Sequence, residues 1–170
     1  DRIFAVAQLL RLGCNVQQIA FETKIDGFFL EKMKKIIEME NMLKANPWNR
    51  DVLHEAKRGG FSDRAVAWLW NTDEDTVFRI RKEMHLFPVY KMIDTCASEF
   101  DSYVPYFYST YEEENESIAE DRKKILVLGS GPIRIGQGVE FDYSTVHAVK
   151  TIRNAGYEAI VILSLIHISE

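Results

Sequence analysis

Roughly the first ninety residues carry apolar side chains at the three- and four-residue spacing of amphipathic helices. The positions that form this pattern are Phe4, Leu9, Leu10, Phe28, Phe29, Met33, Ile36, Ile37 and Met42. Asn15, Ser62 and Thr72 each precede a helical stretch, where a short polar side chain can accept a hydrogen bond from a free first-turn amide. Glycine ends the preceding helices at Gly13 and at positions 59–60. The pattern predicts a helical domain.

The helical stretch contains an internal repeat with an offset of 47 residues. Residues 11–15 correspond to residues 58–62, Asp26 corresponds to Asp73, and Leu30 corresponds to Val77. We expect two copies of a helix, glycine turn, short helix and longer helix, packed face to face so that each covers the apolar stripe of the other. Chance similarity between helical hairpins is the alternative. The expected packing places Trp68, which stands opposite Phe21, in the core.

The character of the sequence changes after Pro88, because β-branched and aromatic residues at 89–94 and 103–111 favour extended structure. Residues 111–121 are dense in glutamate, which predicts a solvated linker and a domain boundary. Residues 125–128 then predict a strand buried on both faces. A helix over 143–154 and a strand over 159–162 complete the start of a parallel β-α-β crossover.

The expected fold is therefore mixed. An all-α helical domain covers residues 1–100, a connector and acidic linker covers 101–122, and the first β-α-β of a parallel α/β domain covers 123–162. Residues 163–170 remain outside this scheme.

Composition narrows the function classes. In 170 residues, 46% hydrophobic and 28% charged positions are typical of a soluble globular protein, and a net charge of −5 argues against nucleic acid and anionic membranes as partners. Cys14 and Cys96 lie far apart, which predicts reduced thiols and no zinc site. The chain begins at Asp1 and shows no signal segment or membrane-length apolar run, so we expect a cytoplasmic protein cut from something longer.

The candidate chemistry lies in the glycine-rich loop at residues 129–144, between the first strand and the helix. Ligands of open α/β folds bind at this edge of the sheet, and glycine lets backbone amides approach an anion. Arg134 replaces the third glycine of a dinucleotide fingerprint and no Walker sequence follows, so a nicotinamide oxidoreductase is disfavoured. Glu140 either orients a polar substrate or caps the helix, and both interpretations stay open, whereas Asp142 is expected to cap it.

The run from Gly129 to Ser144 resembles, almost residue for residue, the segment that opens a synthetase half of the carbamoyl phosphate synthetase large subunit. Residues 89–100 and 108–112 resemble the lead-in to that family's second half, and residues 23–30 resemble its oligomerisation domain. The resemblance covers residues 1 to about 162 in the family's own order. It implies an oligomerisation domain followed by the start of a pre-ATP-grasp domain.

The resemblance implies an ATP-dependent carbon–nitrogen ligase that makes carbamoyl phosphate from bicarbonate, glutamine-derived ammonia and two ATP, for arginine and pyrimidine biosynthesis. Gly138 and Glu140 match positions that line the carbamate tunnel. The loop scaffold is formed by Gly129, Gly131, Arg134, Gly136, Gln137 and Asp142. No catalytic residue or metal ligand is expected in this chain, which should be inactive alone.

The same resemblance implies that the parent enzyme uses ATP, Mg²⁺ or Mn²⁺, and K⁺, bound outside this chain. It implies a glutaminase small subunit as partner and a homo-oligomer formed through the helical domain. After Ile162 the family continues with an asparagine-rich turn ending in Pro-Glu-Thr, whereas residues 163–170 resemble translated sequencing-adapter sequence. We interpret those residues as a non-native tail.

Two other function classes compete with this interpretation. Residues 62–84 have the outline of a helix-turn-helix, but Asp73, Glu74 and Asp75 would repel phosphates at the start of its second helix. We interpret Arg79, Arg81 and Lys82 as the solvated face of that helix, and His54, His85 and His147 as isolated side chains that bind no metal. A free-standing helical protein-interaction module is the other alternative.

Overall fold

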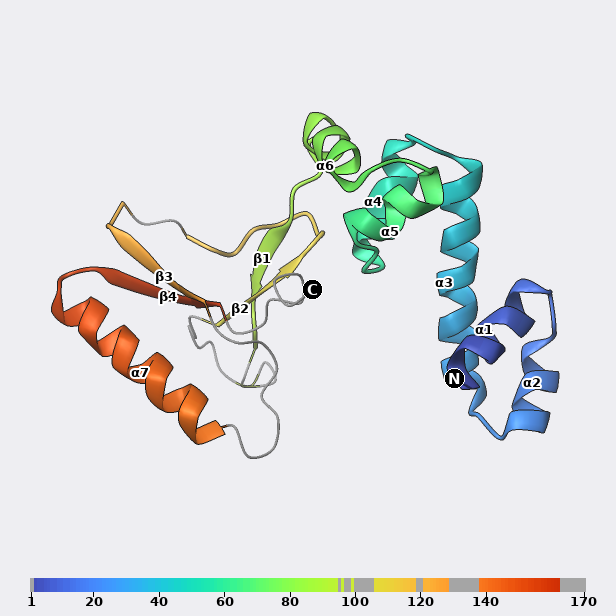
Figure 1. The fold of residues 1–170 in the computed structure, drawn as a ribbon, viewed down its shortest axis with the longest axis horizontal. Helices are drawn as coiled ribbons and strands as arrows, with labels where there is room; N and C mark the ends of the chain where they lie inside the picture. The colour runs from blue at the N-terminus through green and yellow to red at the C-terminus, as the bar shows by residue number, and fades with distance from the viewer. Residues whose placement is uncertain are drawn as a thin grey trace. The chain divides into compact units, whose positions relative to one another are not determined.

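The computed structural model describes residues 2–94, 96, 99, 106–118, 121–128 and 138–162, with backbone alone for 138–142. Contacts divide the chain into two compact units, Asp1–Ser117 and Ile118–Glu170. Helices dominate the first unit and a small parallel sheet with one helix makes up the described part of the second (Figure 1). The predicted mixed fold class is confirmed. Within the described ranges, no helix is both long and apolar enough to cross a membrane.

The helices of the first unit are α1 (Arg2–Arg11), α2 (Val16–Thr23), α3 (Gly27–Ala45), α4 (Arg50–Arg58), α5 (Asp63–Trp70) and α6 (Glu74–Glu83). Two predicted N-caps are confirmed, because Asn15 accepts a hydrogen bond from the amide of Gln17 and Ser62 accepts one from the amide of Ala65. The predicted cap at Thr72 is wrong. Asp73 caps α6 instead, and its carboxylate accepts from the amide of Thr76 at 2.8 Å.

The backbone confirms the internal repeat. The caps Asn15 and Ser62 are related by the 47-residue offset, as are Asp26 and Asp73, which cap α3 and α6. The left-handed residues follow the same rule: Gly13 (φ +83°) corresponds to Gly60 (φ +87°), and Lys24 (φ 59°) corresponds to Asn71 (φ 54°). Helices that are capped and joined by left-handed turns at equivalent positions are two copies of one unit, although α3 is longer than its counterpart α6.

The expected face-to-face packing of the two copies is wrong. The first copy has its own buried cluster, which includes Val6, Ile19 and Leu30, and the second copy has another, which includes Leu53 and Val66. Helix α3 is 19 residues long, roughly 28 Å. It contributes Leu30 and Ile37 to the first cluster and Leu43 to the second. Figure 1 shows α1 and α2 against one end of α3 and α4 and α5 near the other. One long helix therefore joins two small cores.

The tryptophans divide between the core and the surface. Trp70 is buried, and its indole nitrogen donates to the carbonyl of Leu43 at 2.9 Å, where the last turn of α3 leaves carbonyls without a helical partner. Trp48 packs on Trp70 with ring centroids 4.7 Å apart. Trp68 is 75% exposed, so its predicted place in the core is wrong. Val66, Ala67 and Trp70 occupy the inward face of α5, which turns position 68 outward.

Strands β1 (Val89–Met92) and β2 (Phe107–Thr110) form an antiparallel pair with Val89 opposite Thr110. The acidic stretch that follows returns to the other edge of β1. Asn115 accepts a hydrogen bond from the amide of Tyr90, and the amide of Glu116 donates to the carbonyl of Tyr90. The carboxylate of Glu116 accepts from the amide of Met92 at 2.6 Å, in the role that a strand carbonyl would play. This part of the acidic stretch thus lies along the sheet edge.

The second unit contains β3 (Lys124–Leu128), α7 (Gly138–Asn154) and β4 (Glu158–Ile162). The strands pair in parallel, with Ile125 opposite Ala159 and Leu128 opposite Ile162, which confirms the predicted β-α-β unit. The expectation that β3 is buried on both faces is wrong, since Leu126 and Leu128 are more than half exposed. The described unit supplies β4 at one edge of β3 and α7 as a cover, which leaves apolar surface of this strand open.

Candidate functional site

The predicted loop site lies between the carboxyl end of β3 and the start of α7. Strand β3 ends at Leu128 and α7 begins at Gly138, so the expected strand and the expected helix are both present. The residues predicted as the loop scaffold that fall outside the described residues are Gly129, Gly131, Arg134, Gly136 and Gln137.

Helix α7 begins earlier than the sequence pattern indicates. Gly138, Glu140 and Asp142 all belong to its first two turns, although the helix was expected from Tyr143 onward. Asp142 therefore lies inside the helix and does not cap it. The side chains of Glu140 and Asp142 are outside the described part of the structure. The first turn of α7 follows the carboxyl end of a parallel strand, where free amides give a positive electrostatic potential.

Within the described ranges, no three side chains of His, Cys, Asp or Glu gather. The three predicted isolated histidines each contact a different neighbour. His54 Nε2 lies 3.2 Å from the carbonyl oxygen of Tyr111, and the rings of His85 and His147 lie beside Phe87 and Tyr143. These contacts are those of packed or surface side chains.

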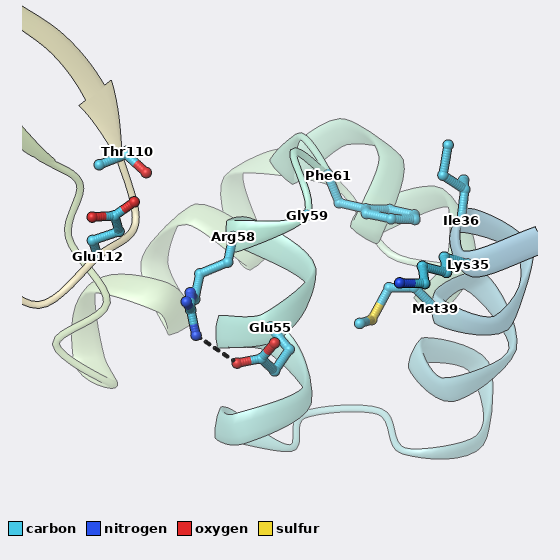
Figure 2. A pocket seen from close by; sticks show the side chains of 9 residues that line it. All are labelled: Lys35, Ile36, Met39, Glu55, Arg58, Gly59, Phe61, Thr110 and Glu112. Carbon is cyan, nitrogen blue, oxygen red and sulfur yellow. Dashed lines mark hydrogen bonds and ion pairs between the residues drawn. The ribbon is translucent and has the colours of Figure 1, made fainter. Parts of the chain in front are cut away.

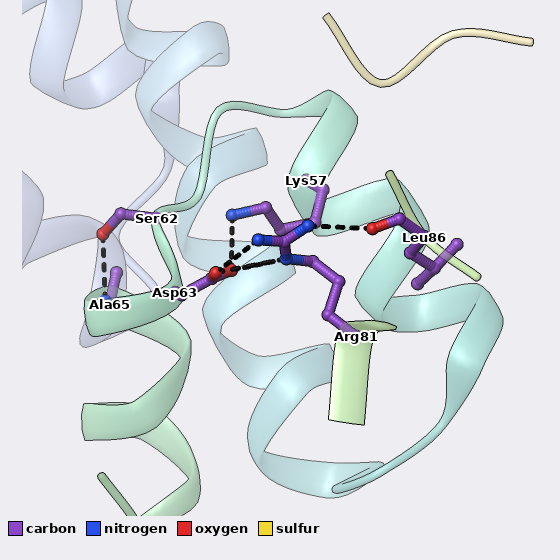
Figure 3. Close-up of polar contacts among 6 residues, drawn as sticks. All are labelled: Lys57, Ser62, Asp63, Ala65, Arg81 and Leu86. Carbon is purple, nitrogen blue, oxygen red and sulfur yellow. Dashed lines mark hydrogen bonds and ion pairs between the residues drawn. The ribbon is translucent and has the colours of Figure 1, made fainter. Parts of the chain in front are cut away.

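The most buried charges in the described chain form a cluster of Lys57 on α4, Asp63 on α5 and Arg81 on α6 (Figure 3). The Lys57 ammonium donates to Asp63 at 2.8 Å, and the Arg81 guanidinium donates to both oxygens of the same carboxylate at 2.9 to 3.2 Å. Arg81 also donates to the carbonyl of Leu86 at 2.9 Å. The side chains of Lys57, Asp63 and Arg81 are 6%, 11% and 8% exposed. Two cations therefore share one carboxylate inside the second repeat copy.

The cluster shifts the titration of its members. Burial lowers the pKa of Lys57, and the nearby guanidinium of Arg81 adds to this effect against the opposing pull of Asp63. For Asp63, burial acts to raise the pKa, but the hydrogen bonds from Arg81 and Lys57 outweigh it and hold the pKa below its ordinary value. The two neighbouring cations therefore favour the ionised form of the Asp63 carboxylate.

Tyr111, which follows β2 directly, covers this cluster. Its ring centroid lies 5.1 Å from the Lys57 ammonium and 5.6 Å from the Arg81 guanidinium carbon. Burial raises the pKa of its hydroxyl. The cation–π contacts and the bond between His54 and the Tyr111 backbone attach the end of β2 to the helical repeat. The prediction that Arg81 lies on a solvated face is wrong, which removes one of the basic side chains that a DNA-reading helix would need.

A groove of about 410 Å³ lies next to this attachment point (Figure 2). Met39 and Lys35 from α3, Glu55 and Arg58 from α4, and Phe61 from the following turn form one part of its lining. Thr110 and Glu112, the neighbours of Tyr111, form the other part. Arg58 donates to Glu55 at 3.2 Å within the groove. The groove combines apolar walls with side chains of both charge signs.

Comparison with protein families matches both parts of the chain. Residues 1–85, half of the 170 residues, match the oligomerisation domain of the carbamoyl-phosphate synthetase large chain. Residues 121–166 match the preATP-grasp domain of carbamoyl phosphate synthase. The chain belongs to the carbamoyl-phosphate synthetase large chain family.

The two family domains map onto the two structural units. The oligomerisation domain contains α1 to α6, and the preATP-grasp match contains β3, α7 and β4. Strands β1 and β2 lie between the two matched ranges. The resemblance found in the sequence is therefore confirmed. The protein therefore contains domains of the large chain of a ligase, carbamoyl-phosphate synthetase.

Sequence reasoning missed the cluster of Lys57, Asp63 and Arg81, although the repeat contains a signal for it. At the equivalent positions of the first copy, Leu10 and Val16 take the places of Lys57 and Asp63, and both are buried. Charges at two positions that are core positions in the other copy indicate a buried ion pair, because an isolated charge there would be too costly.

Proposed function

We propose that this chain is a segment of a large subunit that makes carbamoyl phosphate from bicarbonate, ammonia released from glutamine, and two ATP, in the cytoplasm, for arginine and pyrimidine biosynthesis. The observation that carries the proposal is the order of the two family matches, an oligomerisation domain followed by a preATP-grasp domain in one chain. In this proposal the helical unit is a self-associating scaffold. The loop from β3 to α7 borders the passage that carries carbamate.

The role of the loop rests on two positions, Gly138 and Glu140, at the start of α7. A glycine leaves space for a small anion, and a carboxylate can accept hydrogen bonds from the amide group of carbamate. The parent enzyme with Glu140→Ala is expected to hydrolyse more ATP for each carbamoyl phosphate that it forms. Glu140→Gln, which keeps the size and the oxygen acceptor, should lose less. An unchanged ratio of ATP to product in Glu140→Ala would remove Glu140 from the passage.

The scaffold role is supported by the apolar surface of the helical unit. Phe4, Phe21, Phe28 and Trp68 are each more than 60% exposed, on α1, α2, α3 and α5. Large exposed aromatic groups are typical of surfaces that bind another protein. Sedimentation velocity of the purified chain at rising concentration should show reversible self-association. A strictly monomeric profile at high concentration would contradict it.

The cofactors and the partner of the proposed reaction belong to the parent enzyme. ATP, Mg²⁺ or Mn²⁺, and K⁺ would be bound by other parts of the large subunit, and a glutaminase small subunit would supply ammonia. Among the described residues, no three potential metal ligands come together. The resemblance places the residues that bind ATP outside this chain, so we expect the chain alone to hydrolyse no ATP.

A free-standing helical interaction module is the second candidate, and the exposed apolar side chains of the helical unit favour it equally. Resequencing the source nucleic acid from the codon of Val161 onward, with a different adapter, separates the two. Continuation into Asn, Pro-Glu-Thr and an ATP-grasp domain supports the enzyme. A gene that stops at Glu170 supports the free-standing module.

A further inference from the structure

We propose that Tyr111 and Arg81 form a clasp that holds an arm of the first unit, and that opening the clasp lengthens the tether to the second unit. The arm is β1, β2 and the acidic return at residues 115–116. The clasp is Tyr111 with the three side chains that contact it, Arg81, Lys57 and His54. The inference goes beyond the proposed synthetase activity, because it assigns a conformational change to residues of the first unit alone.

Arg81 contacts the chain on both sides of the arm. Its guanidinium donates to the carbonyl of Leu86 at 2.9 Å, just before β1 (Figure 3). The carbon of the same guanidinium lies 5.6 Å from the ring centroid of Tyr111, just after β2. Leu86 is buried and belongs to the hydrophobic cluster of the second repeat copy. One side chain of α6 thus contacts the chain where it leaves the helical repeat and where it returns.

The two sides of the arm are held unequally. Leu86 is part of a hydrophobic core, whereas the ring of Tyr111 lies over two cations and its carbonyl oxygen lies 3.2 Å from His54 Nε2. Cation–π contacts and single hydrogen bonds are individually weak. The groove of about 410 Å³ lies beside Tyr111, where packed side chains would otherwise reinforce the attachment. The Tyr111 side is therefore the one that releases.

The described part of the arm has no hydrophobic core that would keep it folded without the clasp. Each strand has four residues, and neither strand contributes to the two buried clusters of the described chain. The return at 115–116 adds hydrogen bonds to β1 through Asn115 and Glu116, which water can replace. Isolated two-stranded sheets are marginally stable. We therefore expect the arm to melt as one unit when Tyr111 releases, while α4 to α6 stay folded.

Release changes the length of chain that tethers the second unit, which begins at Ile118. With the clasp closed, residues 112–117 link the second unit to the point at which Tyr111 is held. With the clasp open, the link extends back to Leu86 and consists of residues 87–117. A longer flexible link lowers the effective concentration of one unit near the other. The clasp is therefore a conformational device that sets how far the second unit can separate from the helical repeat.

Native-state amide hydrogen exchange of the ¹⁵N-labelled full chain tests the clasp. The probes in the arm are the hydrogen-bonded amides of Tyr90, Met92, Ile93 and Glu116. The reference probes are the amides of Val66 and Val77 in α5 and α6, whose side chains are fully buried. The arm probes should share one protection factor, at least roughly tenfold below that of the reference probes, because the arm opens as a unit without the helices.

Two substitutions of Tyr111 isolate the contribution of its ring. Tyr111→Ala removes the ring from both cations and should speed the exchange of all four arm probes by a common factor, roughly fivefold to thirtyfold. Tyr111→Phe keeps the aromatic face and should stay within about threefold of the wild type. The reference probes should change by less than about threefold in both variants, which distinguishes release of the arm from loss of the fold.

A matched pair of substitutions on α6 tests the part of Arg81. Arg81→Lys keeps the charge but loses the fork of hydrogen bonds, so the ratio of arm exchange to reference exchange should rise at least roughly threefold. Arg79→Lys, at an exposed position on the same helix, should leave this ratio unchanged. Trypsin cleavage after Lys91, whose side chain is 13% exposed in β1, should accelerate in Tyr111→Ala by the same factor as arm exchange.

Equal protection of the arm probes and the reference probes would overturn the inference, because the arm would then open only together with the helices. Arm probes that respond to Tyr111→Ala one by one, or an equal effect of Tyr111→Phe and Tyr111→Ala, would also contradict it. An equal effect of Arg79→Lys and Arg81→Lys would remove Arg81 from the clasp. None of these results bears on the synthetase proposal, which rests on the two family matches and is tested in the parent enzyme.

Discussion

The two repeat copies of the helical unit share helix caps and left-handed turns, but at two buried positions the first copy is apolar and the second is charged. Leu10 and Val16 are buried in the first copy, and Lys57 and Asp63 stand at the same places in the second. The equivalent of Arg81 is Lys34, which is about half exposed. The caps and left-handed turns coincide, so the copies differ in side-chain chemistry alone at these places. The second copy thereby gains a charged surface on which Tyr111 docks.

The comparison indicates that the cluster of Lys57, Asp63 and Arg81 has a role other than stabilising the fold. Removing two cations and a carboxylate from water costs several kcal/mol per ion, which their attraction only offsets, whereas Leu10 and Val16 stabilise the first copy by apolar burial directly. We infer that the cluster serves to specify where the end of β2 attaches.

The largest expected effect comes from removing the shared carboxylate. Asp63→Ala leaves Lys57 and Arg81 buried without a counter-charge and should lower the free energy of unfolding by about 3 to 5 kcal/mol. Urea denaturation followed by tryptophan fluorescence measures it, since all three tryptophans lie in the helical unit. Leu10→Ala in the first copy is the matched comparison, at about 2 to 4 kcal/mol. A loss below about 1 kcal/mol for Asp63→Ala would show that the cluster is not buried in solution.

Replacing all three members of the buried ion cluster by apolar side chains should not destabilise the protein. The triple variant Lys57→Leu, Asp63→Val, Arg81→Met should be as stable as the wild type or up to about 2 kcal/mol more stable, because apolar packing replaces desolvated ions. Amide hydrogen exchange of Phe107–Thr110 should become faster, since Tyr111 loses both cations beneath its ring. Unchanged amide exchange of Phe107–Thr110 would contradict the proposal that the cluster holds Tyr111 in place.

Lowering the pH should reduce the stability of the second repeat copy more than that of the first. The folded pKa of Asp63 lies below its unfolded value of about 3.9, so near that pH the unfolded chain binds more protons. The stabilisation from the ionised carboxylate is therefore present above about pH 4 and is lost as pH falls through the folded pKa. Urea midpoints between about pH 6 and pH 3 should fall more steeply for the wild type than for the triple variant. Parallel profiles would contradict the lowered pKa.

The smallest effect on stability is expected at the exposed aromatic pair that the repeat relates. Phe21→Ala and Trp68→Ala should each change the free energy of unfolding by less than about 0.5 kcal/mol, because both side chains are at least 70% exposed. Chemical denaturation followed by circular dichroism at 222 nm tests this without relying on Trp68 itself. A loss of more than about 2 kcal/mol in either variant would place that side chain in a core, as the sequence pattern predicted for Trp68.

Local sequence patterns predicted the helices and strands. They gave the wrong burial for side chains whose position depends on contacts between residues far apart in the chain. Asn15 and Ser62 were recognised as caps, because an N-cap bond joins residues that are neighbours in the chain. Thr72 was the wrong choice beside Asp73, whose carboxylate accepts the better bond. Arg81 was misplaced because its partner Asp63 lies 18 residues away on another helix. The outward turn of Trp68 depends on which face of α5 meets α3.

The candidate site shows the same limit. The strand, loop and helix around residues 129–144 follow from local apolar runs, and the resemblance of that loop to its family required no geometry. The roles of Gly138 and Glu140 stay predictions. The groove could not be predicted, since Lys35 and Glu112 come from segments joined by the docking of Tyr111.

Patterns along the amino-acid sequence were enough to find the repeat, the N-caps Asn15 and Ser62, and the β-α-β start of the second unit, and the family resemblance supplied the order of the two domains. The caps and the strand and helix segments depend on hydrogen bonds and apolar spacing between residues close in the chain, which a sequence pattern can reveal. The tertiary structure alone decided that α3 joins two separate cores, that Glu116 lines the edge of β1, and that Lys57, Asp63 and Arg81 form one cluster under Tyr111. Burial explains the difference. A charged side chain stays solvated unless other elements bury it, and only then does it need an ion-pair partner.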